Sequence, residues 1–531
     1  MANENLSNDI AKFLQSQTNN PQVAELGREI QNKIELGSTA IHYKHKIEDS
    51  LISDDAKSGY IVQKDGLAGF RRFYNQEQRI RAEFLNSDST TYDRNKVKSA
   101  IETIMGYLNL NQVESIDLQW QACLSSLQQS RFILTGGPGT GKTTTVVRMM
   151  LLYLILNKDK HIALSAPTGK AANQMMHSIS QQIVDIEVPN GLKQKLELKA
   201  QTIHRLLGYN NQKNTVKYNQ HNPLPYDLII IDESSMLDVS LTYAILQALK
   251  PSAQLILIGD KNQLPAVEAG NVFADLCQLL TQVSENEMPQ NLLEYYLNDK
   301  NEDLEITHYM ALQKNYRFTH DSTIAQLCTA LSQSDSSIFH RLKNNNRLPW
   351  FDPVKKTDKK QLLKKWFANV PKGESTILLS AVNNGFNSVA ELNDIVRDIL
   401  YSNNSYNQGM PIMVTKNDYA LGVFNGDIGH LNLIENQWQV VFNIQGDQKF
   451  ISLSALSDWQ QANAITIHKS QGSEYDHVLI ALPNDDELKI LTNALLYTAI
   501  SRAKKTITLW ADEEIIDKII KTSENRITFL K

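Results

Sequence analysis

A glycine-rich stretch, GGPGTGKT at residues 136–143, has the residue types and the spacing of a phosphate-binding loop. It follows an apolar run of strand length and precedes a helical stretch, as such a loop must. Glycines let backbone N–H groups point inward and bind phosphates at the positive end of a helix. Lys142 then reaches the β- and γ-phosphates, and the Thr143 hydroxyl binds Mg²⁺. The expected binding residues are Gly136, Gly137, Pro138, Gly139, Thr140, Gly141, Lys142, Thr143 and Thr144.

Two acidic residues, Asp232 and Glu233, follow the apolar run at residues 229–231. They lie at the C-terminal end of an expected buried strand, where open α/β sheets bind their ligands. Asp232 is suited to hold Mg²⁺ through water, and Glu233 to polarise an attacking water. An Asp-Glu pair after a strand is also consistent with a helix cap. Its occurrence together with the phosphate loop favours the catalytic interpretation.

Three further residues are candidates for contact with the γ-phosphate. Gln263, in the stretch GDKNQLP that follows another apolar run, could sense this phosphate. Arg317, in QKNYRF, and Arg502, in YTAISRAKK, are candidates for stabilising its charge from the second half of the chain, across a cleft. Taken alone, each of these residues would be an ordinary turn or surface residue, so the assignment depends on the presence of all the motifs together.

Short apolar runs alternate with helical stretches from residue 131 onward, which indicates βαβ units. Such nearly uninterrupted runs are typical of parallel strands that are buried on both faces. The expected strands lie at residues 132–136, 161–167, 226–233, 254–260, 376–381, 465–472, 477–483 and 506–510. Because four precede residue 270 and four follow residue 370, we expect two α/β halves.

Four other regions differ from this pattern. Residues 1–110 have helical apolar spacing and no catalytic signature, which favours a packing or partner-binding domain. Residues 281–305 are acidic and polar, and we expect a peripheral excursion there. The basic stretch 355–365 favours a solvated helix face over a DNA site. Residues 410–455 resemble short antiparallel strands, with an Asn-Gly hairpin turn at 425–426, and predict a small β-barrel insert.

The composition is that of a globular protein, with 42% hydrophobic and 21% charged residues in a chain of 531. Acidic residues outnumber basic ones by 58 to 53, which excludes a protein that coats nucleic acid through overall charge but permits a local basic channel. The three cysteines form no CxxC pair, so neither a disulfide framework nor a zinc knuckle is expected. With no signal-peptide pattern and no apolar segment of membrane-spanning length, we expect a cytoplasmic protein without membrane contact.

The ordered set of motifs resembles the superfamily 1 DNA helicases, and among them the RecD family, the alpha subunit of exodeoxyribonuclease V. The resemblance covers roughly residues 112–512. Its blocks are IDLQWQA (116–122), GGPGTGKTTT (136–145), SAPTGKAA (165–172), TIHRLLG (202–208), IIIDESSML (229–237), IGDKNQLPAVEAG (258–270), QKNYRF (313–318), ALGVFNGDIG (420–429), TIHKSQGSEYDHV (466–478) and YTAISRA (497–503).

The resemblance implies roles for the matching residues. Gln119 looks like the residue that reads adenine, so the nucleotide is ATP, with Thr143 and Asp232 as ligands of Mg²⁺. Gln263 resembles a γ-phosphate sensor, and Arg317 and Arg502 resemble arginine fingers. Contacts with single-stranded DNA are implied for Pro167, Thr168, Lys170, Thr202, His204, Asn425, Thr466, His468 and Lys469.

The implied fold is α/β: two RecA-like parallel-sheet motor domains of the P-loop NTPase type, a helical N-terminal domain and a small SH3-like β insert. We expect the N-terminal domain at residues 1–110 and motor domain 1 at 111–283, with a small hairpin insert near 209–224. A linker at 284–310 leads to motor domain 2 at 311–531, which carries the SH3-like insert at about 405–457.

The implied function is that of an ATP-dependent 5′→3′ DNA helicase subunit, which works with RecB and RecC in a heterotrimer on double-strand ends. Any nuclease activity would belong to the complex, because no carboxylate–lysine nuclease cluster stands out. About 110 residues precede the adenine-reading motif, with no helix-hairpin-helix repeat, which favours the subunit form. Two alternatives stay open: a free-standing RecD-like or conjugation-type helicase, and a scaffold subunit with a vestigial ATP site.

Overall fold

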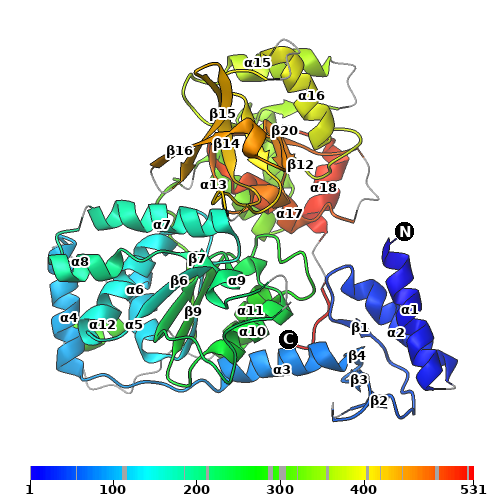
Figure 1. Ribbon diagram of the computed structural model, residues 1–531, viewed down its shortest axis with the longest axis vertical. Coiled ribbons are helices and arrows are strands. Elements are labelled where there is room, and N and C mark those ends of the chain that lie inside the picture. The colour runs from blue at the N-terminus through cyan, green and yellow to red at the C-terminus, as the bar shows by residue number, and fades with distance from the viewer. Residues whose placement is uncertain are drawn as a thin grey trace.

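The computed structural model contains two α/β lobes, a β insert and an N-terminal domain, arranged as Figure 1 shows. The second lobe, with its insert, lies above the first in that view, and the N-terminal domain lies to one side. The structure describes residues 2–18, 20–54, 57–110, 117–184, 186–210, 215–284, 291–297, 307–319, 321–353, 358–401, 406–418, 420–444, 447–484, 489–522 and 526–531.

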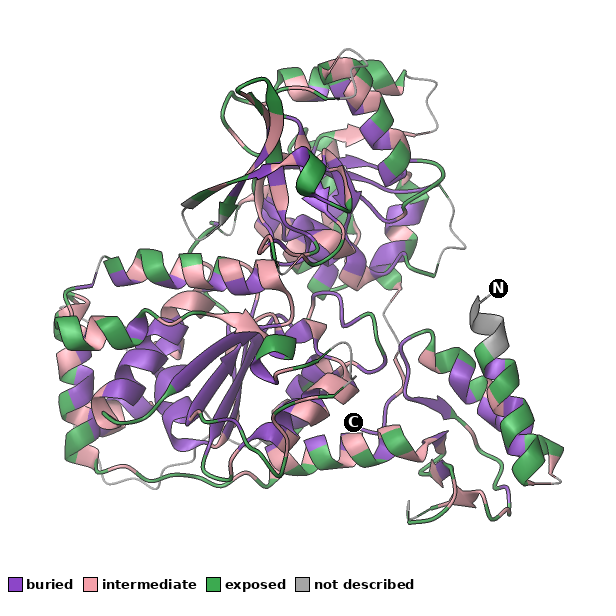
Figure 2. Cartoon of the chain, in the orientation of Figure 1, coloured by how far each residue is buried: buried purple, intermediate pink, exposed green. Residues whose placement is uncertain are grey.

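The first lobe is built on a parallel sheet in the order β10-β5-β9-β8-β6-β7. Its strands are β5 Arg131–Gly136, β6 Ile162–Ala166, β7 Gln201–Thr202, β8 Leu228–Ile231, β9 Gln254–Gly259 and β10 Tyr309–Leu312. Phe132 and Leu134 of β5 enter one apolar cluster and Ile133 enters another, so both faces of the sheet are buried (Figure 2). This double burial explains the uninterrupted apolar runs in the sequence.

Helices cover both faces of this sheet. One apolar cluster receives side chains from α4 Arg94–Tyr107, α5 Leu118–Gln128, α6 Lys142–Leu156, α7 Gly169–Val184, α8 Asn190–Leu196 and α12 Leu292–Leu297. The other receives side chains from α3 Arg71–Leu85, α9 Ile203–Leu206, α10 Val239–Ala248 and α11 Val272–Ser284. The helices α3 and α4 therefore pack on the first lobe, although the sequence analysis placed them in the N-terminal domain.

The second lobe has a parallel sheet in the order β11-β20-β19-β12-β18. Its strands are β11 Trp350–Phe351, β12 Thr376–Ser380, β18 Ala464–Thr466, β19 Tyr475–Ala481 and β20 Ala503–Trp510. Its helices are α13 Thr323–Ser332, α14 Ser337–Asn344, α15 Lys359–Ala368, α16 Val389–Leu400, α17 Asn493–Ile500 and α18 Glu513–Lys521. Together with the first sheet, this lobe confirms the expected pair of parallel-sheet α/β domains.

The insert is an antiparallel sheet in the order β16-β15-β14-β13-β17. Its strands are β13 Pro411–Val414, β14 Ile428–Ile434, β15 Gln437–Ile444, β16 Asp447–Ser452 and β17 Trp459–Gln461. The tight hairpin turn falls at Glu435 and Asn436, which both have positive φ, between β14 and β15. The expected Asn-Gly turn at 425–426 lies instead in the longer connection from β13 to β14, so the sequence signal marked a turn but not the hairpin.

The N-terminal domain combines two helices with a small sheet in the order β1-β4-β3-β2. Its elements are α1 Ala2–Gln17, α2 Pro21–Ile34, β1 Ala40–His42, β2 Ile52–Ser53, β3 Ile61–Lys64 and β4 Leu67–Phe70. The helices agree with the expectation, whereas the sheet was not predicted. Strands this short contain too few residues to display an alternating apolar pattern.

Two boundaries differ from those expected. The strand β10 Tyr309–Leu312 pairs with β5, so the first lobe extends beyond residue 310. Within the expected linker, α12 packs on the first lobe, because the Leu292 N–H donates to Oε1 of Gln121 at 3.0 Å. The other linker residues, 285–290 and 298–306, lie outside the described residues, as do 211–214 of the expected hairpin and 354–357 of the basic stretch.

The C-terminal residues 526–531 return from the second lobe to the first lobe and the N-terminal domain (Figure 1). The backbone N–H groups of residues 39–40 donate to the Ile527 carbonyl at 2.9 and 3.1 Å. The Thr528 hydroxyl donates to the buried Asp275 of α11 at 2.8 Å. This segment therefore ties three parts of the chain together. None of the helices described is long and apolar enough to cross a membrane.

Candidate nucleotide site and strand-binding edge

The phosphate loop connects β5 to α6, as its sequence requires. Gly139 and Gly141 have φ of +76° and +84°, a conformation that favours glycine. The Lys142 ammonium donates to the carbonyls of Gly136 at 2.7 Å and Gly137 at 3.0 Å, which keeps it over the loop. The start of α6 at Lys142 directs the helix N-terminus toward the same point, so the loop can bind phosphate groups.

Asp232 and Glu233 follow β8 at its carboxyl end. Glu233 has a positive φ of 52°, and its backbone N–H donates to Oδ1 of Asp232 at 2.8 Å. Its side chain makes no capping hydrogen bond to the short 3₁₀ helix Ser234–Met236, so the helix-cap interpretation fails for this carboxylate. Burial raises the pKa of both carboxyl groups, while the nearby Lys142 ammonium acts in the opposite direction.

One cavity of about 490 Å³ brings together most of the predicted nucleotide-site residues. Gln263 lies in it, and its buried Oε1 has no hydrogen-bond partner in the described part of the chain. An unpaired acceptor of this kind fits a hydrogen-bond donor that a bound nucleotide, or a water bound with it, would supply. The predicted residues that line the cavity are Pro138, Gly139, Thr140, Gly141, Lys142, Thr143, Thr144, Asp232, Glu233, Gln263, Arg317 and Arg502.

The magnesium ligands expected from the sequence, Thr143 and Asp232, both line this cavity. Within the described ranges no cluster of three His, Cys, Asp or Glu side chains could hold a metal ion. Mg²⁺ is commonly bound by one or two protein oxygens together with substrate phosphates and water. The donor set therefore fits Mg²⁺ that enters with a nucleotide.

The two arginines reach the cavity from different sides. Arg502 is 3% exposed, and its guanidinium donates to the carbonyls of Thr498 and Ser473 within the second lobe. Arg317 follows β10, and its loop is attached to the phosphate loop, because the Tyr316 N–H donates to the Gly139 carbonyl at 2.8 Å. Only Arg502 thus lies across the cleft as expected. The backbone of Arg317 is held on the first lobe.

The expected adenine end of the site lies beside the phosphate loop. Gln119 is buried at the start of α5, and a Cβ at Gly141 would lie 2.2 Å from its Nε2. The sequence analysis missed Tyr316, a residue that is 58% exposed and that lines a small pocket together with Gln119 and Thr140. Its place in QKNYRF, directly before Arg317, was the available signal, and an exposed aromatic ring can stack on a base.

Most of the candidate DNA-binding residues lie at the carboxyl ends of parallel strands. Pro167 and Thr168 follow β6, Thr202 ends the neighbouring β7, and Thr466 ends β18 in the second lobe. The candidates His204, His468 and Lys469 come directly after these strands. Burial lowers the pKa of His468 and Lys469. Both lobes therefore present hydroxyl and basic groups at one edge of their sheets.

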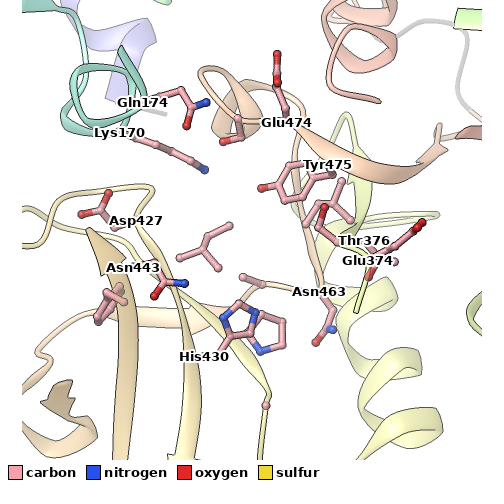
Figure 3. Close-up of a pocket in the computed structure, with 18 of the residues that line it drawn as sticks. Lys170, Gln174, Glu374, Thr376, Asp427, His430, Asn443, Asn463, Glu474 and Tyr475 are labelled. Carbon is pink, nitrogen blue, oxygen red and sulfur yellow. The ribbon is translucent and has the colours of Figure 1, made fainter. Parts of the chain in front are cut away.

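Lys170 and Asn425 depart from this edge. Lys170 points into a second cavity of about 950 Å³, which Asp427 of the insert also lines (Figure 3). Its Nζ is buried without a hydrogen-bond partner among the residues described, and burial lowers its pKa to about 8. Asn425 lies in the loop of the insert whose Phe424 ring packs against Gly169, at the start of α7. The second cavity has no counterpart in the sequence analysis.

Comparison with known proteins agrees with this geometry. Residues 119–269 match the AAA domain family, and residues 461–510 match the UvrD-like helicase C-terminal domain. The chain is 31% identical to the RecBCD enzyme subunit RecD of Buchnera aphidicola subsp. Schizaphis graminum, over 78% of this chain and 75% of that protein. It is 32% identical to the same subunit of Haemophilus influenzae, over 78% of this chain and 71% of that protein.

The chain belongs to the RecD family. The resemblance drawn from the motifs is thereby confirmed. This chain is also similar to the ATP-dependent RecD2 DNA helicase of Deinococcus radiodurans, at 27% identity over 70% of this chain but 46% of that protein. Among solved structures, Pif1 helicase from Bacteroides in complex with ADP-AlF3 and ssDNA is 18% identical with a TM-score of 0.45, over 78% of this chain and 95% of that one.

Proposed function

We propose that this RecD-family chain is an ATP-dependent 5′→3′ DNA helicase subunit that works with RecB- and RecC-type subunits on double-strand ends. The observation that carries the proposal is the cavity that unites Lys142, Asp232, Glu233 and Arg502 between two parallel-sheet lobes. The 5′→3′ polarity and the two partners rest on membership of the RecD family. Superfamily 1 motors hydrolyse ATP at such a cleft and move single-stranded DNA across the two lobes.

The residues of the cavity divide the work of hydrolysis. Lys142 and the loop amides would hold the phosphates, and Thr143 and Asp232 would hold Mg²⁺, which supplies charge neutralisation when bound. Glu233 orients and polarises the attacking water, while Gln263 contacts the γ-phosphate. Arg502 stabilises the charge that spreads over the phosphate oxygens, from the second lobe.

Movement along DNA follows from the two lobes. Each lobe holds the strand at the carboxyl ends of its own strands, through Thr202 on the first lobe and Thr466 on the second. Single strands are bound in this way through their phosphates, with little sequence readout. Closure of the two lobes around ATP moves one DNA-binding site relative to the other, and hydrolysis reopens the cleft, as in a hinge cycle.

The first test is ATP hydrolysis with and without single-stranded DNA. We expect DNA to stimulate hydrolysis and Lys142→Gln to abolish it, because the ammonium that binds the β- and γ-phosphates is lost. Lys158→Gln, at an exposed lysine on the same lobe, is the matched control and should leave the rate unchanged. Hydrolysis that survives Lys142→Gln would refute the proposal and favour a scaffold with a vestigial site.

The second test concerns polarity and partners. The subunit should unwind duplexes with a 5′ single-stranded tail in preference to those with a 3′ tail, and it should elute with RecB- and RecC-type subunits in size-exclusion chromatography. A monomer that unwinds 5′-tailed duplexes at full rate, and that recovers no partner, would instead indicate a free-standing helicase.

A further inference from the structure

Arg317 is engaged in an ion pair that crosses the nucleotide cavity. Its Nη1 lies 2.7 Å from Oε1 of Glu474, in the segment between β18 and β19 of the second lobe. The backbone at Arg317 is fixed to the first lobe, because Tyr316 donates to the Gly139 carbonyl and the Asn315 side chain donates to the Pro138 carbonyl at 2.8 Å. The pair therefore joins the phosphate loop to the second lobe.

Glu474 forms ion pairs with Arg317 and Lys504, and Arg502 lies close to it. Lys504 lies 3.6 Å from its second carboxylate oxygen, and Arg502 binds the carbonyl of the preceding residue, Ser473, at 3.3 Å. Burial on its own would raise the pKa of the Glu474 carboxyl, yet the surrounding cations hold it below its usual value. The carboxylate thus supplies negative charge where the cations of the γ-phosphate site converge.

We propose that Glu474 is a positioning residue that competes with the γ-phosphate of ATP for Arg317, an inference that rests on the function proposed above. A guanidinium bonded to Glu474 must exchange this carboxylate for phosphate oxygens before it can stabilise them. The exchange breaks the ion pair that bridges the lobes, so arrival of the γ-phosphate changes a contact between them. ADP, which lacks this phosphate, does not require the exchange.

The closing experiment compares nucleotide affinities of the full-length chain and of Glu474→Gln. We expect the Kd of a non-hydrolysable ATP analogue to fall about threefold to fivefold in the variant, because the partly buried ion pair between Arg317 and Glu474 no longer competes with the γ-phosphate. The Kd of ADP should change by less than about twofold. An unchanged Kd for the analogue overturns the proposal. A raised Kd overturns it too, because Glu474 would then be a direct ligand of the nucleotide.

Three variants separate this effect from a general disturbance. Glu374→Gln, which removes another carboxylate of the second lobe that is paired with a lysine (Lys505, 2.6 Å), should leave both affinities unchanged. In an Arg317→Gln background, Glu474→Gln should have no further effect on the analogue. Glu474→Asp, which keeps the charge but retracts it, should give an intermediate Kd, and it serves as the second probe if Glu474→Gln unfolds.

The outcome is separable from that of the proposed function. If the unmodified chain shows no DNA-stimulated hydrolysis, or if Lys142→Gln retains it, the proposed function fails. If hydrolysis behaves as expected but Glu474→Gln binds the analogue like the unmodified chain, only the competition between Glu474 and phosphate is refuted.

Discussion

Individual cations in the two cavities differ in how their charge is compensated. Lys142 bonds to carbonyls of its own loop, and Arg317 is paired with Glu474. The Nζ of Lys170, by contrast, is buried without a hydrogen-bond partner within the described residues, and Asp427 lines the same cavity (Figure 3). Because an unpaired buried ammonium is unfavourable, the native state carries a local cost at this residue.

Replacement of Lys170 by methionine tests that cost. We expect Lys170→Met to raise the free energy of unfolding by about 1 kcal/mol, since it removes a buried unpaired charge and keeps most of the hydrocarbon chain. Thermal unfolding measures this. Affinity for single-stranded DNA should stay within about twofold, because Lys170 lines the second cavity and not the proposed DNA-binding edge of the sheets at Thr202 and Thr466.

Lys469→Met is the matched control for that variant, because Lys469 follows β18 at the proposed DNA-binding edge of the second lobe. It should weaken DNA binding and lower the slope of log K against log salt by about one. A large loss of DNA affinity in Lys170→Met would contradict the position of Lys170 and return it to the strand path.

At the scale of elements, the short connection from β5 to α6 contains the phosphate loop of the candidate nucleotide site. Gly141 closes this turn with φ of +84°, and its Cα lies so close to Gln119 that a Cβ would fall 2.2 Å from Nε2. The loop conformation and the expected adenine contact therefore depend on the same glycine.

We expect Gly141→Ala to destabilise the loop by about 1–2 kcal/mol, the usual cost of the left-handed conformation for a residue with a Cβ. It should also raise the KM for ATP, because the Gln119 side chain must move. Steady-state hydrolysis and thermal unfolding measure the two effects. Gly106→Ala in α4, where a Cβ would meet no atom within 4 Å, should instead stabilise by about 0.5–1 kcal/mol. Equal behaviour of the two variants would refute the argument.

At the scale of the whole molecule, a buried carboxyl holds the C-terminal segment against the N-terminal domain. Glu77 of α3 accepts hydrogen bonds from the Thr39 hydroxyl at 2.7 Å and from the Phe529 N–H at 3.0 Å. Burial raises its pKa from 4.5 to about 8, so the carboxyl is protonated at neutral pH in the folded protein. Its contribution to stability is complete below about pH 4.5 and is lost as the pH rises through about 8.

The melting temperature of the unmodified chain should therefore fall between about pH 4.5 and pH 8 and level off above pH 8. Glu77→Gln, which stays neutral, should flatten this dependence. Glu25→Gln, at an exposed residue of α2, should not alter it. Amide hydrogen exchange at residues 526–531 locates the effect, because ionised Glu77 should loosen this segment. The same pH dependence in Glu77→Gln would show that another group is responsible.

Much of the fold and of the nucleotide site could be predicted from local patterns. The phosphate loop, the Asp232–Glu233 pair and the eight expected strands depend on neighbouring residues, whose spacing is visible along the chain. The strand expected at 465–472 is shorter than predicted, because β18 ends at Thr466 and a 3₁₀ helix follows at His468–Ser470. The short strands of the N-terminal domain and the true hairpin turn at Glu435 could not be predicted. Two to four residues show no period, and Glu435-Asn436 is a weaker turn signal than Asn425-Gly426.

The sequence by itself determined the family, the two parallel-sheet lobes and the chemistry of the phosphate loop, because each is encoded in contiguous residues or in their order. Only the tertiary structure decided which side of the cleft holds Arg317, where Lys170 points and which carboxylate binds the arginine. These features depend on contacts between segments far apart in the chain, such as β10 with β5 and β18–β19 with the loop after β10. Packing of whole elements sets such contacts, and no local spacing reports them.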